Sequence, residues 1–269
     1  MTVSLGADVL FQYERFSLYN SPYTAHEDGC AIDLYPSGQV APSPVAGEIF
    51  ETRAVEAPPK PYAPNHDYLI LVDTGSQVAR VLHVKPGVEA GDTVAVGDSL
   101  GTPIRSGFFA PWVPNHLHLG VRPREANHDR ASGSLPIDVD VPLRGVSWDG
   151  SGTVVEVGET WARLDSPAHP DPGAAFVGLE SDGGVLDGGF PHYDTGGLFG
   201  DGKRAVIAGQ EVGTVSGRTV HWEDCRVLAN GEPVTGLSLH CARDQFGLKL
   251  VGRDIDFSVG DRIAVSITR

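Results

Sequence analysis

Polar and apolar residues alternate along the segment Asn115-His116-Leu117-His118-Leu119-Gly120-Val121-Arg122. This period of two predicts a β-strand in which His116 and His118 lie on the same face. Positions i and i+2 of a strand are about 7 Å apart, so the two imidazoles can converge on one small site. One ring can bind a metal ion while the other remains available for proton transfer. Such a pair also occurs on solvated sheet surfaces, so its role depends on what lies around it.

Short apolar segments on the N-terminal side of this pair alternate with turns rich in glycine and proline. Runs of this length bounded by such turns predict strands rather than helices. We expect strands at 30–35, 45–50, 68–73 and 77–84, a strand or short helix at 7–16, and a proline-rich loop at 53–66. Thr74-Gly75-Ser76 predicts a hairpin turn. The pattern is typical of a compact, barrel-like β sandwich.

Residues 145–269 show the same alternation. We expect strands at 153–157, 161–164, 204–208, 212–222, 237–241, 248–251 and 262–267, with a glycine-rich run at 183–202 between them. The polar stretch 122–144 reads as an exit loop and linker. The sequence therefore predicts an all-β protein of two domains, at 1–140 and 141–269.

The charge balance narrows the classes of partner. A net charge of −15 disfavours binding to the phosphates of a nucleic acid. The chain has 16 Arg but only 4 Lys, and 22 Asp against 13 Glu. This balance is typical of proteins from salt-loving archaea or from GC-rich genomes, and it concerns solubility and source rather than chemistry.

Cysteine usage and the first residues bear on the compartment. Cys30, Cys225 and Cys241 show no Cys-x-x-Cys spacing, so we expect neither a disulfide framework nor a cysteine zinc site. The start has no signal-peptide pattern, and no apolar run approaches the length of a membrane span. As written, the sequence predicts a cytoplasmic protein, or an extracytoplasmic one if a leader has been removed.

Candidate partners for the histidine pair lie upstream on the expected neighbouring strands. Asp33 stands in the middle of an apolar strand, where an unpaired carboxylate is costly, so we interpret it as functional. His26 lies on the loop before it, and His83 ends the strand segment Val78-Ala79-Arg80-Val81-Leu82-His83. We expect His66 and His128 to be solvated in polar loops. In the second half, His192, His221 and His240 lack ordered metal-ligand spacing and are interpreted as loop or strand-face residues.

The order of several short motifs narrows the function. They are Asp33-Leu34-Tyr35, Ser43-Pro44-Val45-Ala46-Gly47-Glu48-Ile49, Leu82-His83-Val84, Val88-Glu89-Ala90-Gly91-Asp92-Thr93-Val94, Val96-Gly97-Asp98-Ser99-Leu100-Gly101 and the His116–Arg122 segment. In this order they resemble the lysostaphin/LytM-like zinc metallopeptidases, which have a duplicated hybrid motif β fold. The resemblance covers residues 20–125, and its ordered combination is more specific than any single motif.

The resemblance implies a role for each residue. His26, Asp33 and His118 would hold Zn²⁺, while His83 and His116 would flank the metal-bound water. Three nitrogen and oxygen ligands leave a fourth zinc position open for that water. The metal lowers the pKa of the water, and the free imidazoles orient or deprotonate it and stabilise the oxyanion.

The first motif departs from the family pattern, which is His-x-x-x-Asp. Gly29 stands four residues before Asp33, and His26 stands seven before it. Because some members separate these ligands further, His26 is the preferred ligand. Glu27 or Asp28 could replace it, or the site could have lost its metal.

Three functions follow from these observations. The first is a zinc-dependent endopeptidase that cleaves a peptide or peptide cross-link near small residues, with the C-terminal domain as a substrate-binding or capping module. The second is a catalytically inactive relative that serves as a metal-binding or partner-binding scaffold. The third is a biotinyl or lipoyl carrier, which is disfavoured because neither Lys60 nor Lys85 lies in a Met-Lys-type turn.

Overall fold

The computed structural model describes all 269 residues, Met1 to Arg269. Strands make up 49% of the chain and helices 4%, in large antiparallel sheets with no closed barrel, so the all-β prediction is confirmed. The chain forms two compact units. The N-terminal unit contains Met1–Phe16 and Tyr23–Val141, and the C-terminal unit contains Ser17–Pro22 and Pro142–Arg269. The separate roles expected for 1–140 and 141–269 stay a prediction.

The elements up to residue 141 are short strands with one α-helix and one 3-10 helix. They are β1 (Val3–Gly6), α1 (Ala7–Leu10), β2 (Arg15–Ser17), η1 (Thr24–Gly29), β3 (Ile32–Tyr35), β4 (Gly47–Glu56), β5 (His66–Asp73), β6 (Gln77–Leu82), β7 (Val84–Pro86), β8 (Thr93–Val94), β9 (Gly101–Pro103), β10 (Leu117–Pro123) and β11 (Ile137–Asp140).

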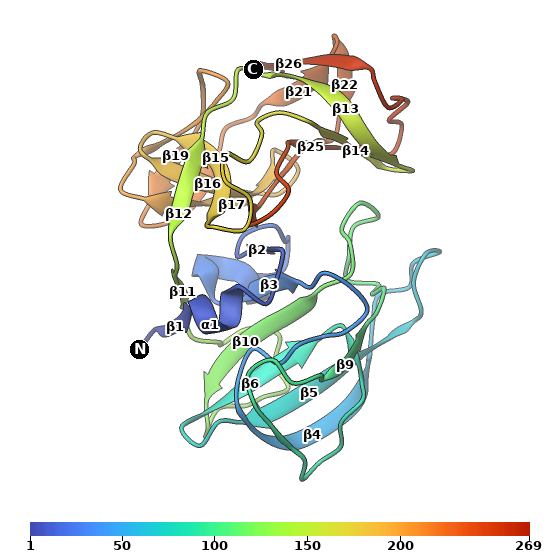
Figure 1. Ribbon diagram of the computed structural model, residues 1–269, viewed down its shortest axis with the longest axis vertical. Coiled ribbons are helices and arrows are strands. Elements are labelled where there is room, and N and C mark those ends of the chain that lie inside the picture. Colours follow the sequence, from blue (N-terminus) through green and yellow to red (C-terminus); the bar gives the residue numbers. More distant parts are fainter. The chain divides into compact units, whose positions relative to one another are not determined.

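The main sheet of the N-terminal unit has the order β3-β10-β6-β5-β4-β8, and all its pairs are antiparallel. Strands β10, β6, β5 and β4 can be followed side by side in Figure 1. Strand β10 lies between β3 and β6, so His118 is directly opposite Asp33 on one side and Leu82 on the other. The His-x-His strand is therefore central and buried rather than a solvated surface strand.

Two expected connections contain strands instead. Strand β4 continues to Glu56 because it pairs with β5 as far as the Glu56–His66 pair, before the first proline of that stretch at Pro58. Within the expected linker, β11 pairs with β1 in parallel. The hairpin turn is confirmed, since Asp73 pairs with Val78 around Gly75, whose φ of 90° suits glycine.

The C-terminal unit is built from β-strands. They are β12 (Leu143–Val146), β13 (Ser151–Gly158), β14 (Trp161–Leu164), β15 (Phe176–Ser181), β16 (Gly184–Phe190), β17 (Thr195–Gly200), β18 (Arg204–Ile207), β19 (Gln210–Ser216), β20 (Thr219–Trp222), β21 (Arg226–Ala229), β22 (Glu232–Val234), β23 (Gly236–Leu239), β24 (Cys241–Ala242), β25 (Lys249–Val251) and β26 (Arg262–Thr268).

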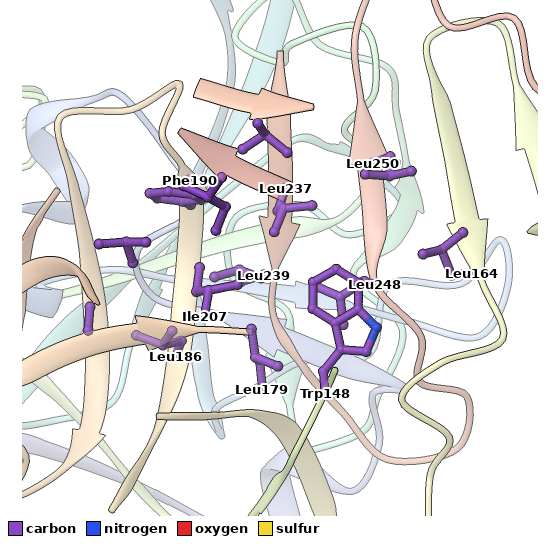
Figure 2. Close-up of a cluster of buried hydrophobic side chains, with 14 of the residues drawn as sticks. Trp148, Leu164, Leu179, Leu186, Phe190, Ile207, Leu237, Leu239, Leu248 and Leu250 are labelled. Atoms are coloured by element: carbon purple, nitrogen blue, oxygen red, sulfur yellow. The ribbon is translucent and has the colours of Figure 1, made fainter. Parts of the chain in front are cut away.

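These strands enclose one apolar cluster, part of which is drawn in Figure 2. An antiparallel series runs β13-β14-β25-β23-β16-β17-β20-β19-β18. The side chains of Leu179, Leu186, Phe190 and Leu237 gather in the centre of the cluster. Burial of such side chains is the main favourable contribution to folding.

The glycine-rich run at 183–202 contains the paired strands β16 and β17. Its glycines give room to aromatic rings. A Cβ at Gly196 would lie 2.2 Å from the Trp222 ring, and one at Gly197 would lie 2.1 Å from the Tyr19 ring. Glycine within a strand often marks such a close approach.

The segment Ser17–Pro22 belongs to the C-terminal unit although it precedes most of the N-terminal one. It is held by the buried carboxylate of Asp187. Ser17 Oγ donates to Asp187 Oδ1 at 2.6 Å, and the backbone N–H groups of Leu18 and Tyr19 donate to Oδ2 at 2.6 and 3.1 Å. The sequence did not predict that Ser17–Pro22 belongs to the C-terminal unit.

Two further observations concern the helices and the cysteines. No helix in the structure has the length and apolar character needed to cross a membrane. All three cysteines are free thiols, with Cys225 and Cys241 buried and Cys30 half-buried.

Candidate metal centre

Three side chains from separate parts of the N-terminal unit converge on one point. His26 Nε2 lies 3.3 Å from Asp33 Oδ1, and His118 Nδ1 lies 3.0 Å from the same oxygen. The nitrogen atoms of His26 and His118 are 3.0 Å apart. The three side chains are buried and form a group that can hold a metal ion.

The fold gives each of the three a different support. Asp33 and His118 are opposite each other on the paired strands β3 and β10. His26 lies on η1, where the chain turns through Asp28 and Gly29, whose φ angles are 54° and 69°. This left-handed turn accommodates the seven-residue spacing to Asp33. Glu27 and Asp28, the alternative ligands, are exposed and lie outside the cluster.

The spacing of the three donor atoms suits a bound metal ion. Four ligands at about 2.0–2.1 Å from a zinc ion lie about 3.3 Å from one another. The three observed separations are 3.0, 3.0 and 3.3 Å. Two imidazole nitrogens and one carboxylate oxygen are also a common set of zinc ligands.

The charge states of the cluster also suit a cation. Burial alone would raise the pKa of the Asp33 carboxyl, but His116 and His26 outweigh it and hold that pKa well below its usual range. Burial lowers the pKa of His118 to about 3. Asp33 is therefore a carboxylate and His118 a neutral imidazole near pH 7, as metal ligands must be.

His116 lies beside this cluster, one residue before β10 begins. Its Nδ1–H donates to the backbone carbonyl of Pro114 at 2.9 Å, which leaves Nε2 as the ring nitrogen outside this contact. That Nε2 lies 3.4 Å from Asp33 Oδ1. The ring stacks on Phe109 with 4.3 Å between centroids. His116 is thus fixed with Nε2 facing the cluster.

His83 completes the group of imidazoles. Its ring centroid is 5.3 Å from that of His116 and 5.7 Å from that of His118. Its Nδ1 lies 2.5 Å from Asp67 Oδ2. Together, the five side chains predicted from the sequence, His26, Asp33, His83, His116 and His118, lie in one region and are each between 2% and 7% exposed.

Sequence reasoning missed Asp67 and Ser106, which lie next to His83. Both are fully buried, and Ser106 Oγ donates to Asp67 Oδ2 at 2.5 Å. The signal was present in the strand at 66–73, where Asp67 stands in phase with the buried Leu69 and Leu71. A carboxylate on an apolar face needs a partner, as Asp33 does.

The other histidines do not belong to this group. His66 is exposed at the start of β5, and the His128 imidazole bonds to the Arg124 carbonyl within a polar loop. In the C-terminal unit, His192 follows β16, His221 is exposed on β20, and His240 is buried between β23 and β24.

Comparison with protein families identifies the chain. Residues 4–139 match the model described as the N-terminal domain of a domain of unknown function, DUF8155, and residues 144–268 match the model of its C-terminal domain. The chain belongs to this family.

Comparisons with individual proteins are less informative. No curated protein matches the sequence significantly. Among solved structures, the NMR solution structure of lysostaphin is similar at 14% identity, covering 87% of this chain and 89% of that one, with a TM-score of 0.29. So loose a similarity leaves the function to be argued from the residues.

Proposed function

We propose that the N-terminal unit is a zinc-dependent peptide hydrolase of the endopeptidase type. His26, Asp33 and His118 hold the zinc ion, and His83 and His116 handle protons. The observation that carries this proposal is the triangle of three donor atoms 3.0–3.3 Å apart, with His116 Nε2 directly beside it. The order of motifs that resembles the lysostaphin/LytM-like peptidases supports the same assignment.

The donor set favours zinc over the harder cations. Calcium and magnesium prefer sites built from oxygen atoms, whereas this cluster offers two nitrogens and one carboxylate oxygen. When bound at such a site, zinc supplies a Lewis acid that polarises a carbonyl and lowers the pKa of water.

The two remaining histidines suit proton transfer. The carbonyl of Pro114 holds Nδ1–H of His116, which leaves Nε2 free to accept a proton. Because all five side chains are nearly buried, a peptide with small side chains would reach them most easily. This is the basis for proposing cleavage near small residues. We further propose that Pro142–Arg269 binds or caps the substrate.

A scaffold that binds metal without hydrolysis is the second candidate. The altered spacing in the first motif favours it. Gly29 stands at the position that is histidine in the lysostaphin/LytM-like peptidases. The two candidates share a metal site and differ in whether His116 takes part in a reaction.

Metal analysis of the purified protein tests the site. We expect about one zinc per chain in the wild type, and its loss in Asp33→Ala and His118→Ala. His66→Ala, which removes an exposed histidine, is the matched control and should keep its zinc. Equal zinc content in all four proteins would sink the assignment.

A peptide assay separates the two candidates. We expect the zinc-loaded protein to release new amino groups from glycine-rich peptides, and His116→Ala to lose this activity while it keeps the metal. A wild-type protein that binds zinc and releases no amines, over a range of peptides, would support the scaffold.

A further inference from the structure

Asp67 makes an unusually complete set of contacts with His83. Its Oδ2 lies 2.5 Å from His83 Nδ1, and its Oδ1 accepts the backbone N–H of the same residue at 3.0 Å. One carboxylate therefore holds both the ring and the main chain of His83. A carboxylate oxygen can only accept, so Nδ1 of His83 carries a proton, and Nε2 is the ring nitrogen outside this contact.

The carboxylate is itself held in place. Ser106 Oγ donates to Oδ2 at 2.5 Å, and the Tyr68 backbone N–H donates to Oδ1 at 2.6 Å. Burial by itself would raise the pKa of Asp67, but His83 and these hydrogen bonds lower it below the ordinary value. Asp67 is thus an ionised acceptor with fixed orientation.

The backbone of His83 is an independent sign that this position is specified. Its φ is 71°, in the left-handed region that residues other than glycine rarely adopt. Such a conformation is unfavourable and persists only where surrounding contacts impose it. Here the Ile104 N–H donates to the His83 carbonyl at 2.8 Å, while Asp67 binds the N–H. The edge of Phe109 packs on the ring, with centroids 4.7 Å apart.

The order of hydrogen bonds at Ser106 differs from that of a serine hydrolase. In a serine hydrolase the hydroxyl bonds to the imidazole, and the carboxylate bonds to the other ring nitrogen. Here Ser106 Oγ donates to the carboxylate rather than to an imidazole, so its role is to support Asp67.

We propose that Asp67 is the positioning residue of His83: it fixes the tautomer with the proton on Nδ1 and directs Nε2 to the reaction at the adjacent metal site. This inference rests on the proposed peptide hydrolase. His116 has the same arrangement, with the Pro114 carbonyl in place of the carboxylate. His83 and His116, which are not among the three proposed metal ligands, are therefore both anchored through Nδ1, and this leaves Nε2 as the reactive atom.

The tautomer can be measured in the full-length zinc-loaded protein. A long-range ¹H–¹⁵N correlation spectrum distinguishes the two tautomers, and His83→Ala assigns the signal. We expect Nδ1–H in the wild type, whereas a wild-type His83 with the proton on Nε2 would overturn the proposal. This measurement needs neither hydrolysis nor a variant of Asp67.

Asp67→Asn then tests the consequence. Its amide can still accept from the His83 backbone but presents an NH₂ group to Nδ1, which shifts the ring proton to Nε2. We expect kcat to fall on the order of 10²-fold with zinc content and KM unchanged, and no additional loss when the substitution is made in His83→Ala. Ser106→Ala, which leaves the carboxylate, should keep the Nδ1–H tautomer.

The outcomes separate the two proposals. An Asp67→Asn protein with the wild-type tautomer and the wild-type kcat would refute the role of Asp67. If the wild type shows no hydrolysis, the proposed function fails, and the tautomers of the wild type and of Asp67→Asn still decide whether Asp67 positions His83.

Discussion

Two buried aspartates, one in each unit, have opposite surroundings. The polar contacts of Asp33 are with the imidazole nitrogens of His26, His116 and His118. Asp187 instead receives the Ser17 hydroxyl and the backbone N–H groups of the next two residues. A carboxylate that accepts such hydrogen bonds has its hydrogen-bonding capacity met by protein donors and needs no bound ion. One whose polar partners are imidazole nitrogens can share them with a metal ion.

The comparison separates a structural carboxylate from a functional one by its partners, since both are buried to a similar degree. Asp67 combines both kinds of contact. Asp67 accepts backbone N–H groups as Asp187 does, and it contacts an imidazole as Asp33 does.

The largest expected effect is on stability, through Asp187→Ala. Three buried donors lose an acceptor, so we expect the free energy of unfolding to fall by about 3 kcal/mol or more. Asp187→Asn should lose less, because its amide keeps one acceptor and can donate to Ser17 Oγ. In the metal-free protein Asp33→Ala should cost about 1 kcal/mol or less, since His26 and His118 can bond to each other. Urea unfolding followed by circular dichroism measures all three, and equal losses at the two aspartates would break the comparison.

The next effect is the response of stability to zinc. At a free zinc concentration about 100 times Kd, the wild type and Asp187→Asn should each gain about 2.7 kcal/mol of unfolding free energy. Asp33→Ala should gain nothing, and a chelator should reverse the gain in the other two. Thermal unfolding with and without zinc measures this. A similar gain in Asp33→Ala would mean that zinc binds elsewhere.

A smaller effect tests how tightly Ser17–Pro22 is held in the C-terminal unit. In Gly197→Ala the new methyl group meets the Tyr19 ring, so we expect a loss of about 1–3 kcal/mol. Gly38→Ala is the control, since no atom lies within 4 Å of its added Cβ. If both variants unfold at the same urea concentration, Tyr19 does not pack against β17 in solution.

The smallest expected effect is the acid dependence due to Asp67. Its pKa is lower in the folded protein than in the unfolded chain, so it contributes stability above about pH 4, the ordinary range of an aspartate. This contribution is lost as the pH falls through the folded-state pKa. The difference in unfolding free energy between wild type and Asp67→Asn should therefore shrink between neutral pH and pH 3. A difference that stays constant over this range would show that the folded protein does not lower the pKa of Asp67.

Much of the N-terminal unit was predictable from local pattern. Alternation of apolar residues predicted the strands, and Thr74-Gly75-Ser76 predicted the hairpin turn that the structure contains. The structure of the glycine-rich run was harder to predict, because its glycines pack against the rings of Tyr19 and Trp222, which are distant in the sequence. Local composition does not show which aromatic residue will pack against a glycine.

The candidate site was also predictable only where local pattern showed it. Asp33 stood out as a carboxylate within an apolar strand, and Asp67 has the same property at the start of β5. The feature that distinguishes Asp67 as functional is its contact with His83. That histidine lies 16 residues further along the chain and has a left-handed backbone conformation. No periodic pattern predicts that conformation in a histidine.

By itself the sequence determined that this is an all-β protein, and its period of two predicted that His116 and His118 converge on one site, although the strand itself begins at Leu117. Only the tertiary structure decided that Asp33 is opposite His118, that the turn at Asp28 and Gly29 brings His26 to both, and that Asp67 holds His83. These contacts depend on strand register and on turns between distant segments. Such features are set by the packing of the whole unit rather than by neighbouring residues.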